Sequence, residues 1–271
     1  MRTLHVAVAQ INAKATKVRD NLRRIHSQIK SAAAVKVDAI LFAEVAIHGY
    51  DFSAKNLALA QPPDGPIGQQ LSRWADRYGL TIMAGFLEAE AAGHYVSQLV
   101  AQAGAKPFAQ RKHSITPDEI KAGFAPGPRE RTLFRIKDVT CAVLICADTG
   151  IEGIHAELRQ QGVEYLFIPT AGGGTLDQML HEADLARPEI AQKYTEVRPR
   201  VFNTQAILPE ADCKFPGWAS ANALGYDGKE RCHQGHCMIV DRQRVMRAQI
   251  PGTIVLEHQQ DQMVHAVLSF P

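Results

Sequence analysis

The sequence predicts a mixed α/β protein in which helices cover sheets built from buried strands. Short apolar runs alternate along the 271 residues with longer segments whose apolar side chains recur every three or four positions. No stretch rich in proline, glycine or serine divides the chain, so we expect a single domain over residues 1–271. Hydrophobic residues make up 46% and charged residues 21% of the chain, which excludes wholesale disorder.

Helical periodicity is clearest in two segments of the first half of the chain and recurs twice in the second half. The expected helices are Lys17–Lys36, Ile67–Tyr78, Ile151–Gln161 and Leu176–Val197. Gly79 directly follows the second of these, in the position where glycine commonly ends a helix. Pro188 interrupts the fourth, because proline lacks the backbone N–H that a helix interior needs.

The expected strands are short apolar runs between these helices and after them. In chain order they are Leu4–Ala9, Ala39–Phe42, Leu80–Leu87, His94–Gln102, Pro107–Arg111, Thr132–Ile136, Val139–Ile145, Tyr165–Ile168, Val201–Leu208, His236–Val240, Val245–Gln249, Thr253–Leu256 and Val264–Leu268. Runs of this length without strict alternation are typical of strands buried on both faces. We expect Trp74 to pack in the core, and Trp218 to be exposed or to lie at a subunit contact.

Charge and hydropathy limit the classes of partner. Thirty Lys and Arg residues against 28 Asp and Glu residues give a net charge of +2, without the basic field that nucleic acids or anionic membranes attract. No apolar run is long enough to span a bilayer. The first residues enter a strand-like run without the pattern of a signal peptide, so we expect a cytoplasmic protein with free thiols.

Reactive side chains follow three of the expected strands. Glu44 follows the run AILF, where burial would raise its pKa and make it a better base. Lys112 ends another strand, where its charge could stabilise an oxyanion. Cys146 precedes a helix whose positive end would lower the pKa of the thiol, whereas Cys141 has the offset of a core residue on the opposite face. Considered one at a time, each of the three is better explained by an ordinary structural or surface role.

Taken together, these residues resemble a known catalytic set. Glu44, Lys112 and Cys146 occur in the order and at the spacing of the Glu-Lys-Cys triad of the nitrilase (carbon–nitrogen hydrolase) superfamily. The surrounding text is similar to the blocks of that family. The segments are AILFAEVAIHGYDF, QRKHSITPDEIKAGFAPG, VTCAVLICADTGIEG and, near the end, GHCMIVDRQRVMRAQIPG.

The resemblance implies a four-layer α-β-β-α sandwich that associates as a homodimer or larger homo-oligomer. It also implies that Cys146 is the nucleophile, that Glu44 is the general base and acid, and that Lys112 stabilises the oxyanion with help from the backbone N–H of Ala147. Glu119 matches the family's second glutamate, which positions the substrate and the lysine. No metal and no organic cofactor is implied, because the thiol, the base and the oxyanion clamp complete the reaction.

The implied activity is hydrolysis of a non-peptide C–N bond in a small linear amide or N-carbamoyl compound, through a cysteine thioester and with release of ammonia. Asp148 gives the order C-x-D, which is commoner among amidases of the family than among true nitrilases. A nitrilase that acts on a nitrile is the alternative with the same mechanism. A catalytically silent binding or scaffold protein is the alternative from a different class.

The sequence departs from the family around the nucleophile. Ala147 replaces an aromatic residue, which should enlarge the pocket beside the sulfur, and Gly150–Gly153 replaces the usual R-F-P-E. Some carboxylate-binding amidases have an arginine at the position of Gly150, so a substrate held in that way is not expected. The small-residue segment reads PTAGGGT over Pro169–Thr175. The catalytic core is therefore kept, while the residues that set specificity are altered.

Two other patterns were weighed. Four metal-ligand types lie close together near the end of the chain: Cys232, His233, His236 and Cys237. They form two adjacent pairs, and neighbouring residues rarely reach the same ion, so we expect no metal site. An unrelated α/β hydrolase is disfavoured because the chain contains no G-x-S-x-G elbow.

Overall fold

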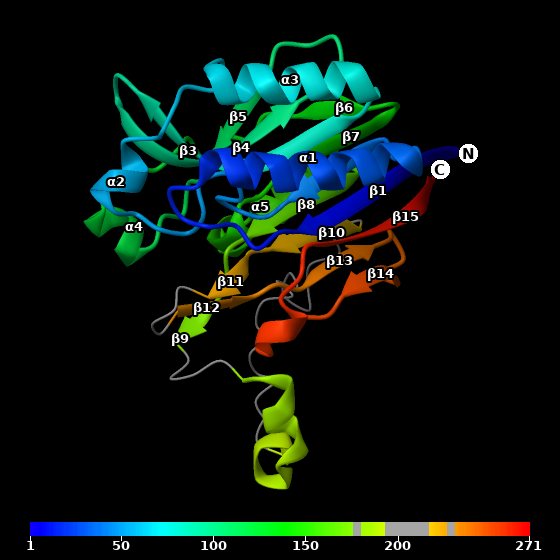
Figure 1. Ribbon diagram of the computed structural model, residues 1–271. Coiled ribbons are helices and arrows are strands. Elements are labelled where there is room, and N and C mark those ends of the chain that lie inside the picture. The colour runs from blue at the N-terminus through cyan, green and yellow to red at the C-terminus, as the bar shows by residue number, and fades with distance from the viewer. Residues whose placement is uncertain (176–179, 193–216, 227–230) are drawn as a thin grey trace.

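The computed structural model describes residues 1–175, 180–192, 217–226 and 231–271, and within them two six-stranded sheets pack face to face (Figure 1). The first sheet has the order β15-β1-β2-β3-β4-β5 and the second β14-β13-β10-β8-β7-β6. The strands of the first are β1 Arg2–Gln10, β2 Ala39–Phe42, β3 Thr81–Glu90, β4 Gly93–Ala101, β5 Phe108–Arg111 and β15 Gln262–Phe270. Those of the second are β6 Phe134–Ile136, β7 Val139–Val143, β8 Tyr165–Thr170, β10 Trp218–Asn222, β13 Cys237–Val240 and β14 Met246–Ile250.

Alternation of side chains across each strand produces three separate apolar cores. In β1, Val6 and Val8 face the second sheet, where they share a core with Tyr165 and Phe167. Ala7 on the same strand points the other way, toward the helices. Helices α1 (Val18–Ala34) and α3 (Pro66–Tyr78) cover that outer face, and α5 (Ile154–Gln160) packs on the outer face of the second sheet. The predicted four-layer α-β-β-α sandwich is confirmed.

Helix ends follow the local sequence. Pro66 occupies the first turn of α3, where its missing N–H costs nothing. Gly79 ends the helix with a φ of 66°, a left-handed conformation that favours glycine, as the sequence predicts. The shorter helical elements are α2 Ala54–Leu57, α4 Pro117–Lys121, η1 Cys146–Gly150, η2 Glu182–Ala186 and η3 Leu256–His258.

Some expectations differ from the structure. The strand expected over Thr253–Leu256 is wrong: Val255 makes one isolated bridge with Leu180, and the chain then turns into η3. The sequence analysis missed β10, because its WASAN sequence has few of the β-branched residues that favour strands. It also missed a small third sheet, composed of β9 Gly174–Thr175, β11 Leu224–Tyr226 and β12 Arg231–Gln234.

Two expected elements concern parts of the chain that the structure does not fully describe. The strand expected over Val201–Leu208 lies outside the described residues, as does much of the helix expected over Leu176–Val197. Within the described part of that helix, η2 is followed by a helical turn that begins at Pro188. Proline therefore starts a helix here rather than breaking one.

The two tryptophans lie in different layers. Trp74 of α3 is partly buried against the outer core and stacks on His26 of α1, with ring centroids 4.4 Å apart. Trp218 in β10 is buried in the core beneath α5. The expectation of an exposed or interfacial Trp218 was wrong, because the sequence did not reveal the strand that contains it.

His48 is fully buried near the end of the first sheet and joins three segments. Its Nδ1 accepts a hydrogen bond from the backbone N–H of Leu87 at 3.1 Å, so Nε2 carries the proton and donates to the carbonyl of Leu59 at 3.1 Å. Both ring nitrogens are therefore satisfied in the neutral form. Burial lowers the pKa of His48 from 6.5 to about 4.

This histidine makes a testable contribution to acid sensitivity. The unfolded chain binds a proton at His48 below pH 6.5 whereas the folded chain does not until about pH 4, so this stabilising contribution is lost progressively as the pH falls through that window. The expected loss is about 3 kcal/mol across the window. Urea unfolding of the wild type and of His48→Gln at pH 7 and pH 4.5 measures the difference. Equal pH dependence in the two proteins would rule the assignment out.

Candidate active site

Glu44 lies on a tight turn just after β2. The backbone N–H of Ile47 donates to the carbonyl of Gly85 on β3, and the N–H of Gly85 donates to the carbonyl of Ala43. A Cβ atom on Gly85 would lie 2.2 Å from the nitrogen of Val45, so a side chain has no room there. This close contact with β3 fixes the turn and leaves Glu44 with 2% of its surface exposed.

The contact makes Gly85 a position from which the turn can be displaced without altering Glu44 itself. We expect Gly85→Ala to push the turn away from β3 and to lower activity at least about tenfold, because a misplacement of about 1 Å is costly in catalysis. Gly150→Ala is the matched control, since nothing lies within 4 Å of a Cβ atom there. Steady-state assays and thermal unfolding of both variants measure the effect, and equal activity of the two would refute this role of Gly85.

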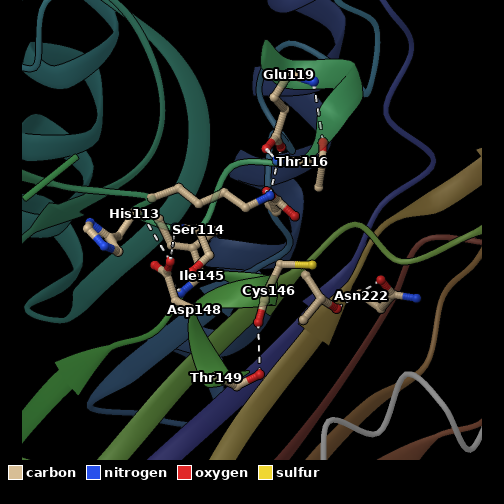
Figure 2. Close-up of polar contacts among 12 residues, drawn as sticks. His113, Ser114, Thr116, Glu119, Ile145, Cys146, Asp148, Thr149 and Asn222 are labelled. Carbon is tan, nitrogen blue, oxygen red and sulfur yellow. Dashed lines mark hydrogen bonds and ion pairs between the residues drawn. The ribbon is translucent and has the colours of Figure 1, made fainter. Parts of the chain in front are cut away.

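Lys112 follows β5 and reaches the same edge of the sheet as Glu44. Strands β2, β3 and β5 run in the same direction, so the residues after β2 and β5 leave the sheet at the same end. The Nζ atom of Lys112 lies 2.8 Å from Oε1 of Glu44 and 2.7 Å from Oε1 of Glu119 (Figure 2). Lys112 is 1% exposed and Glu119 is completely buried. The structure thus brings together three of the predicted residues.

Glu119 is held by the helix that carries it. Thr116 caps α4: its Oγ1 accepts from the backbone N–H of Glu119 at 3.3 Å. In return, Oε2 of Glu119 accepts from the backbone N–H of Thr116 at 2.7 Å. This capping box fixes one carboxylate oxygen and leaves the other for Lys112 (Figure 2).

Electrostatics keeps the lysine charged. Burial by itself would lower the pKa of Lys112, but the negative charges of Glu44, Cys146 and Glu119 outweigh it and raise the pKa above the ordinary value. Burial raises the pKa of Glu44, with Lys112 opposing and Glu119 adding to the shift. The direction predicted for Glu44 is therefore confirmed, and Lys112 is a fixed cation beside it.

Cys146 lies at the first position of η1, three residues after β7 ends. Its φ is 49°, an uncommon conformation for a residue with a side chain, and one that often occurs at functional sites. The thiol contacts the carboxylate of Glu44 and is also reached by the backbone N–H of Ala171. In Figure 2 its sulfur points into the space between the lysine end and Asn222.

The pKa of the thiol differs from the expectation. Burial and the carboxylate of Glu44 raise the pKa of Cys146 to about 12, although Lys112 and the N–H of Ala171 oppose the shift. The predicted lowering by a helix end was wrong, because a short 3-10 turn adds little against a buried carboxylate. The thiol is therefore protonated at rest and lies beside a base that can accept its proton. Cys141 is buried in the core between the sheets, as predicted.

Asp148 is a positioning residue whose structural role the sequence analysis missed. The buried carboxylate accepts backbone N–H bonds from His113 at 3.0 Å, Ser114 at 2.8 Å and Ile145 at 3.3 Å (Figure 2). It also lies 3.6 Å from the guanidinium of Arg131. One side chain thus ties the loop after Lys112 to the turn that carries the cysteine. The order C-x-D was its signal in the sequence, interpreted there as a marker of substrate type.

Thr170 and Asn222 form a second support that no sequence pattern revealed. The backbone N–H of Glu44 donates to the carbonyl of Thr170 at 3.3 Å, which links the two sheets at the site. The Thr170 hydroxyl donates to Oδ1 of Asn222 at 2.8 Å (Figure 2). The amide nitrogen of Asn222 donates to the carbonyls of Gly172 and Gly235, at 3.0 and 2.6 Å. These bonds join the ends of β8 and β10 beneath the cysteine.

A cavity of about 1030 Å³ opens beside the site, and Glu44 is part of its lining. Its walls come from the segment after β1, the Glu44 turn and the segment that follows, α4 and the residues after β10. Ala147, the fifth predicted site residue, lies next to Cys146 at the start of η1 with an exposed side chain. The cavity is large enough for a substrate well beyond the smallest amides.

Two further searches concern metals and membranes. Cys232 and His233 lie in β12, and Cys237 lies at the start of β13. Across the described ranges, no three His, Cys, Asp or Glu side chains are grouped as a metal site would need. In the same part of the chain, no helix combines the length and apolar character that crossing a membrane requires.

Comparison with known proteins identifies the family. Residues 5–194 match the family model described as carbon-nitrogen hydrolase, and the chain belongs to that family. It is 24% identical over 185 residues to Hydrolase MT0498 of Mycobacterium tuberculosis. That match spans 65% of this chain and 65% of the relative.

Solved structures support the same fold. XC1258 from Xanthomonas campestris, described as a CN-hydrolase superfamily protein, matches with a TM-score of 0.75 and 16% identity, over 99% of this chain and 91% of that one. An amidase from Nesterenkonia sp. AN1 matches with a TM-score of 0.69 and 16% identity, over 99% and 93% of the two chains. At this level of identity the likeness shows the fold.

Proposed function

We propose that this carbon–nitrogen hydrolase cleaves the C–N bond of a small amide or N-carbamoyl compound through a thioester on Cys146. The observation that carries the proposal is the convergence of one protonated lysine and one buried glutamate on a single thiol. A nucleophile beside a base, with a fixed cation where negative charge develops, is the arrangement that acyl transfer requires.

The proposed reaction has two halves. As the sulfur of Cys146 attacks the carbonyl carbon, Glu44 takes the thiol proton and Lys112 stabilises the oxyanion together with the backbone N–H of Ala147. The C–N bond then breaks, Glu44 protonates the leaving nitrogen, and ammonia departs. In the second half Glu44 removes a proton from water, which attacks the thioester and releases the acid and the thiol. Glu119 holds Lys112 in place throughout.

The relatives are consistent with this chemistry. The Nesterenkonia amidase undergoes Michael addition of acrylamide at its active-site cysteine. XC1258 carries an arsenic adduct in its active site. We infer an amide rather than a nitrile from the C-A-D sequence that includes Asp148. Nitrile hydrolysis remains the alternative within the same site, and a silent scaffold is the alternative without turnover.

A panel assay separates these three functions. Ammonia release is measured for the wild type with primary amides, N-carbamoyl amines and nitriles of matched acyl groups. The proposal expects turnover of amides or N-carbamoyl compounds and little or none of nitriles. Turnover confined to nitriles would favour the nitrilase. No turnover, combined with equally slow labelling of Cys146 and Cys141 by a thiol reagent, would favour a scaffold.

A further inference from the structure

We propose that Lys14 and two neighbouring lysines at the cavity mouth bind an anionic group of the substrate, so that the preferred substrates are amides with a carboxylate at the end remote from the amide. This inference rests on the proposed function and specifies its substrate class. It concerns residues outside the Glu-Lys-Cys set, on the segment between β1 and α1 and on α4.

Three lysines contribute to the lining of the cavity that contains Glu44. They are Lys14, Lys17 and Lys121. Within the described residues none of the three has an ion-pair partner. Asp261, the acid whose charge acts on Lys14, is paired with Arg24 at 2.8 Å instead. Partial burial, reinforced by Arg24, lowers the pKa of Lys14, which is the expected condition of a cation that lacks an anion.

Lys14 is held at a fixed place relative to Glu44. The amide nitrogen of the buried Asn21 donates to the carbonyl of Lys14 at 2.7 Å and to that of Ile47 at 3.0 Å. Its Oδ1 accepts from the backbone N–H of Lys14 at 2.9 Å. Gly49 packs so closely that a Cβ atom there would lie 2.6 Å from the nitrogen of Ala15. The lysine segment and the Glu44 turn therefore form one rigid wall.

A second buried asparagine reinforces that wall. Oδ1 of Asn56 accepts from the backbone N–H of Thr16 at 3.1 Å, and its amide nitrogen donates to the carbonyl of Asp51 at 2.7 Å. Asp51 and Asp118 also line the cavity and offset part of the lysine charge. The side chain of Asp51 is engaged by the hydroxyl of Ser53 at 2.6 Å, which leaves the lysines as the charged donors open to a ligand.

The charge pattern along the cavity determines where an anion can lie. Two carboxylates, Glu44 and Glu119, surround the single ammonium of Lys112 at the reacting end, so an anion next to the scissile carbonyl is repelled. Between the two ends the wall is apolar, with the rings of Tyr50 and Phe52 4.8 Å apart. The complementary molecule has an amide at one end, an apolar spacer and an anion at the other end.

Binding to the Cys146→Ala protein tests this recognition without turnover. Calorimetry compares glutaramate, its neutral analogue pentanamide, and oxamate, in which the anion adjoins the amide. We expect glutaramate to bind more tightly than the other two, with an advantage that declines as salt is raised. Lys14→Gln should weaken glutaramate binding roughly fivefold to tenfold and leave pentanamide unchanged, as expected for one partly exposed ion pair. Lys30→Gln, on the exposed side of α1 away from the cavity, is the control.

The outcomes distinguish this inference from the proposed function. Equal binding of glutaramate and pentanamide, or equal loss of both in Lys14→Gln, overturns the anion site. Hydrolysis of neutral amides without an anionic preference would overturn the anion site and leave the proposed function intact. Preferential binding of glutaramate without hydrolysis of any amide by the wild type would support the anion site and overturn the proposed function.

Discussion

Replacement of Cys146 by alanine is expected to lower ammonia release by a factor of about 10⁴ or more, because the acyl intermediate can no longer form. The sulfur is the atom on which Glu44 and Lys112 act, and alanine removes it with little change in volume. The fold should persist, since Cys146 lies on a turn at the edge of the core. Initial rates on the best substrate of the panel, with thermal unfolding beside them, measure both effects.

Cys141→Ala is the matched control for this variant. Cys141 is buried between the sheets, and burial raises the pKa of its thiol well above the ordinary range. We expect its replacement to cost about 1 kcal/mol of stability through the small cavity that it leaves, with activity retained. Ammonia release that survives in Cys146→Ala but fails in Cys141→Ala would place the reaction elsewhere.

Lys112→Met is expected to abolish activity and also to destabilise the protein. Removal of an oxyanion-stabilising group costs about 10² to 10³ in rate. Loss of the ammonium also leaves Glu44 and Glu119 buried without a cation, which costs about 3–5 kcal/mol. A carboxylate without its cation has a raised pKa, so this loss should be largest at high pH and smaller as the pH falls.

The double variant Lys112→Met/Glu119→Gln separates the two effects. The second substitution removes one of the two buried negative charges, so part of the lost stability should return in urea unfolding at pH 8. Activity should not return, because the cation beside the oxyanion is still absent. A single variant that is as stable as the wild type at pH 8, or a double variant that regains turnover, would contradict this account of Lys112.

Long or strongly apolar elements could be predicted from the sequence, and small or polar ones could not. The run AILF gives β2 with the predicted bounds, and Gly79 ends α3 as expected. Strand β10 was missed because alanine and serine carry little strand preference. In each case local composition decided the result, since periodicity and end signals are properties of neighbouring residues.

The candidate site was predictable as a set of residues but not as an electrostatic arrangement. Glu44, Lys112 and Glu119 meet as the resemblance implies. The raised pKa of Cys146 depends on burial and on a carboxylate more than 100 positions earlier in the chain, and neither is visible locally. Asp148 was likewise noticed for its spacing alone, while its three backbone partners belong to loops that only the fold brings together.

Rapid acid quench followed by mass spectrometry most directly tests the thioester on Cys146. The wild type is mixed with the amide that it hydrolyses fastest, quenched within the first turnover and digested. We predict that the peptide containing Cys146 gains the mass of the acyl group, and that the adduct is lost on treatment with hydroxylamine. Ammonia release without any acyl adduct at Cys146, together with undiminished turnover by Cys146→Ala, would contradict the proposed mechanism.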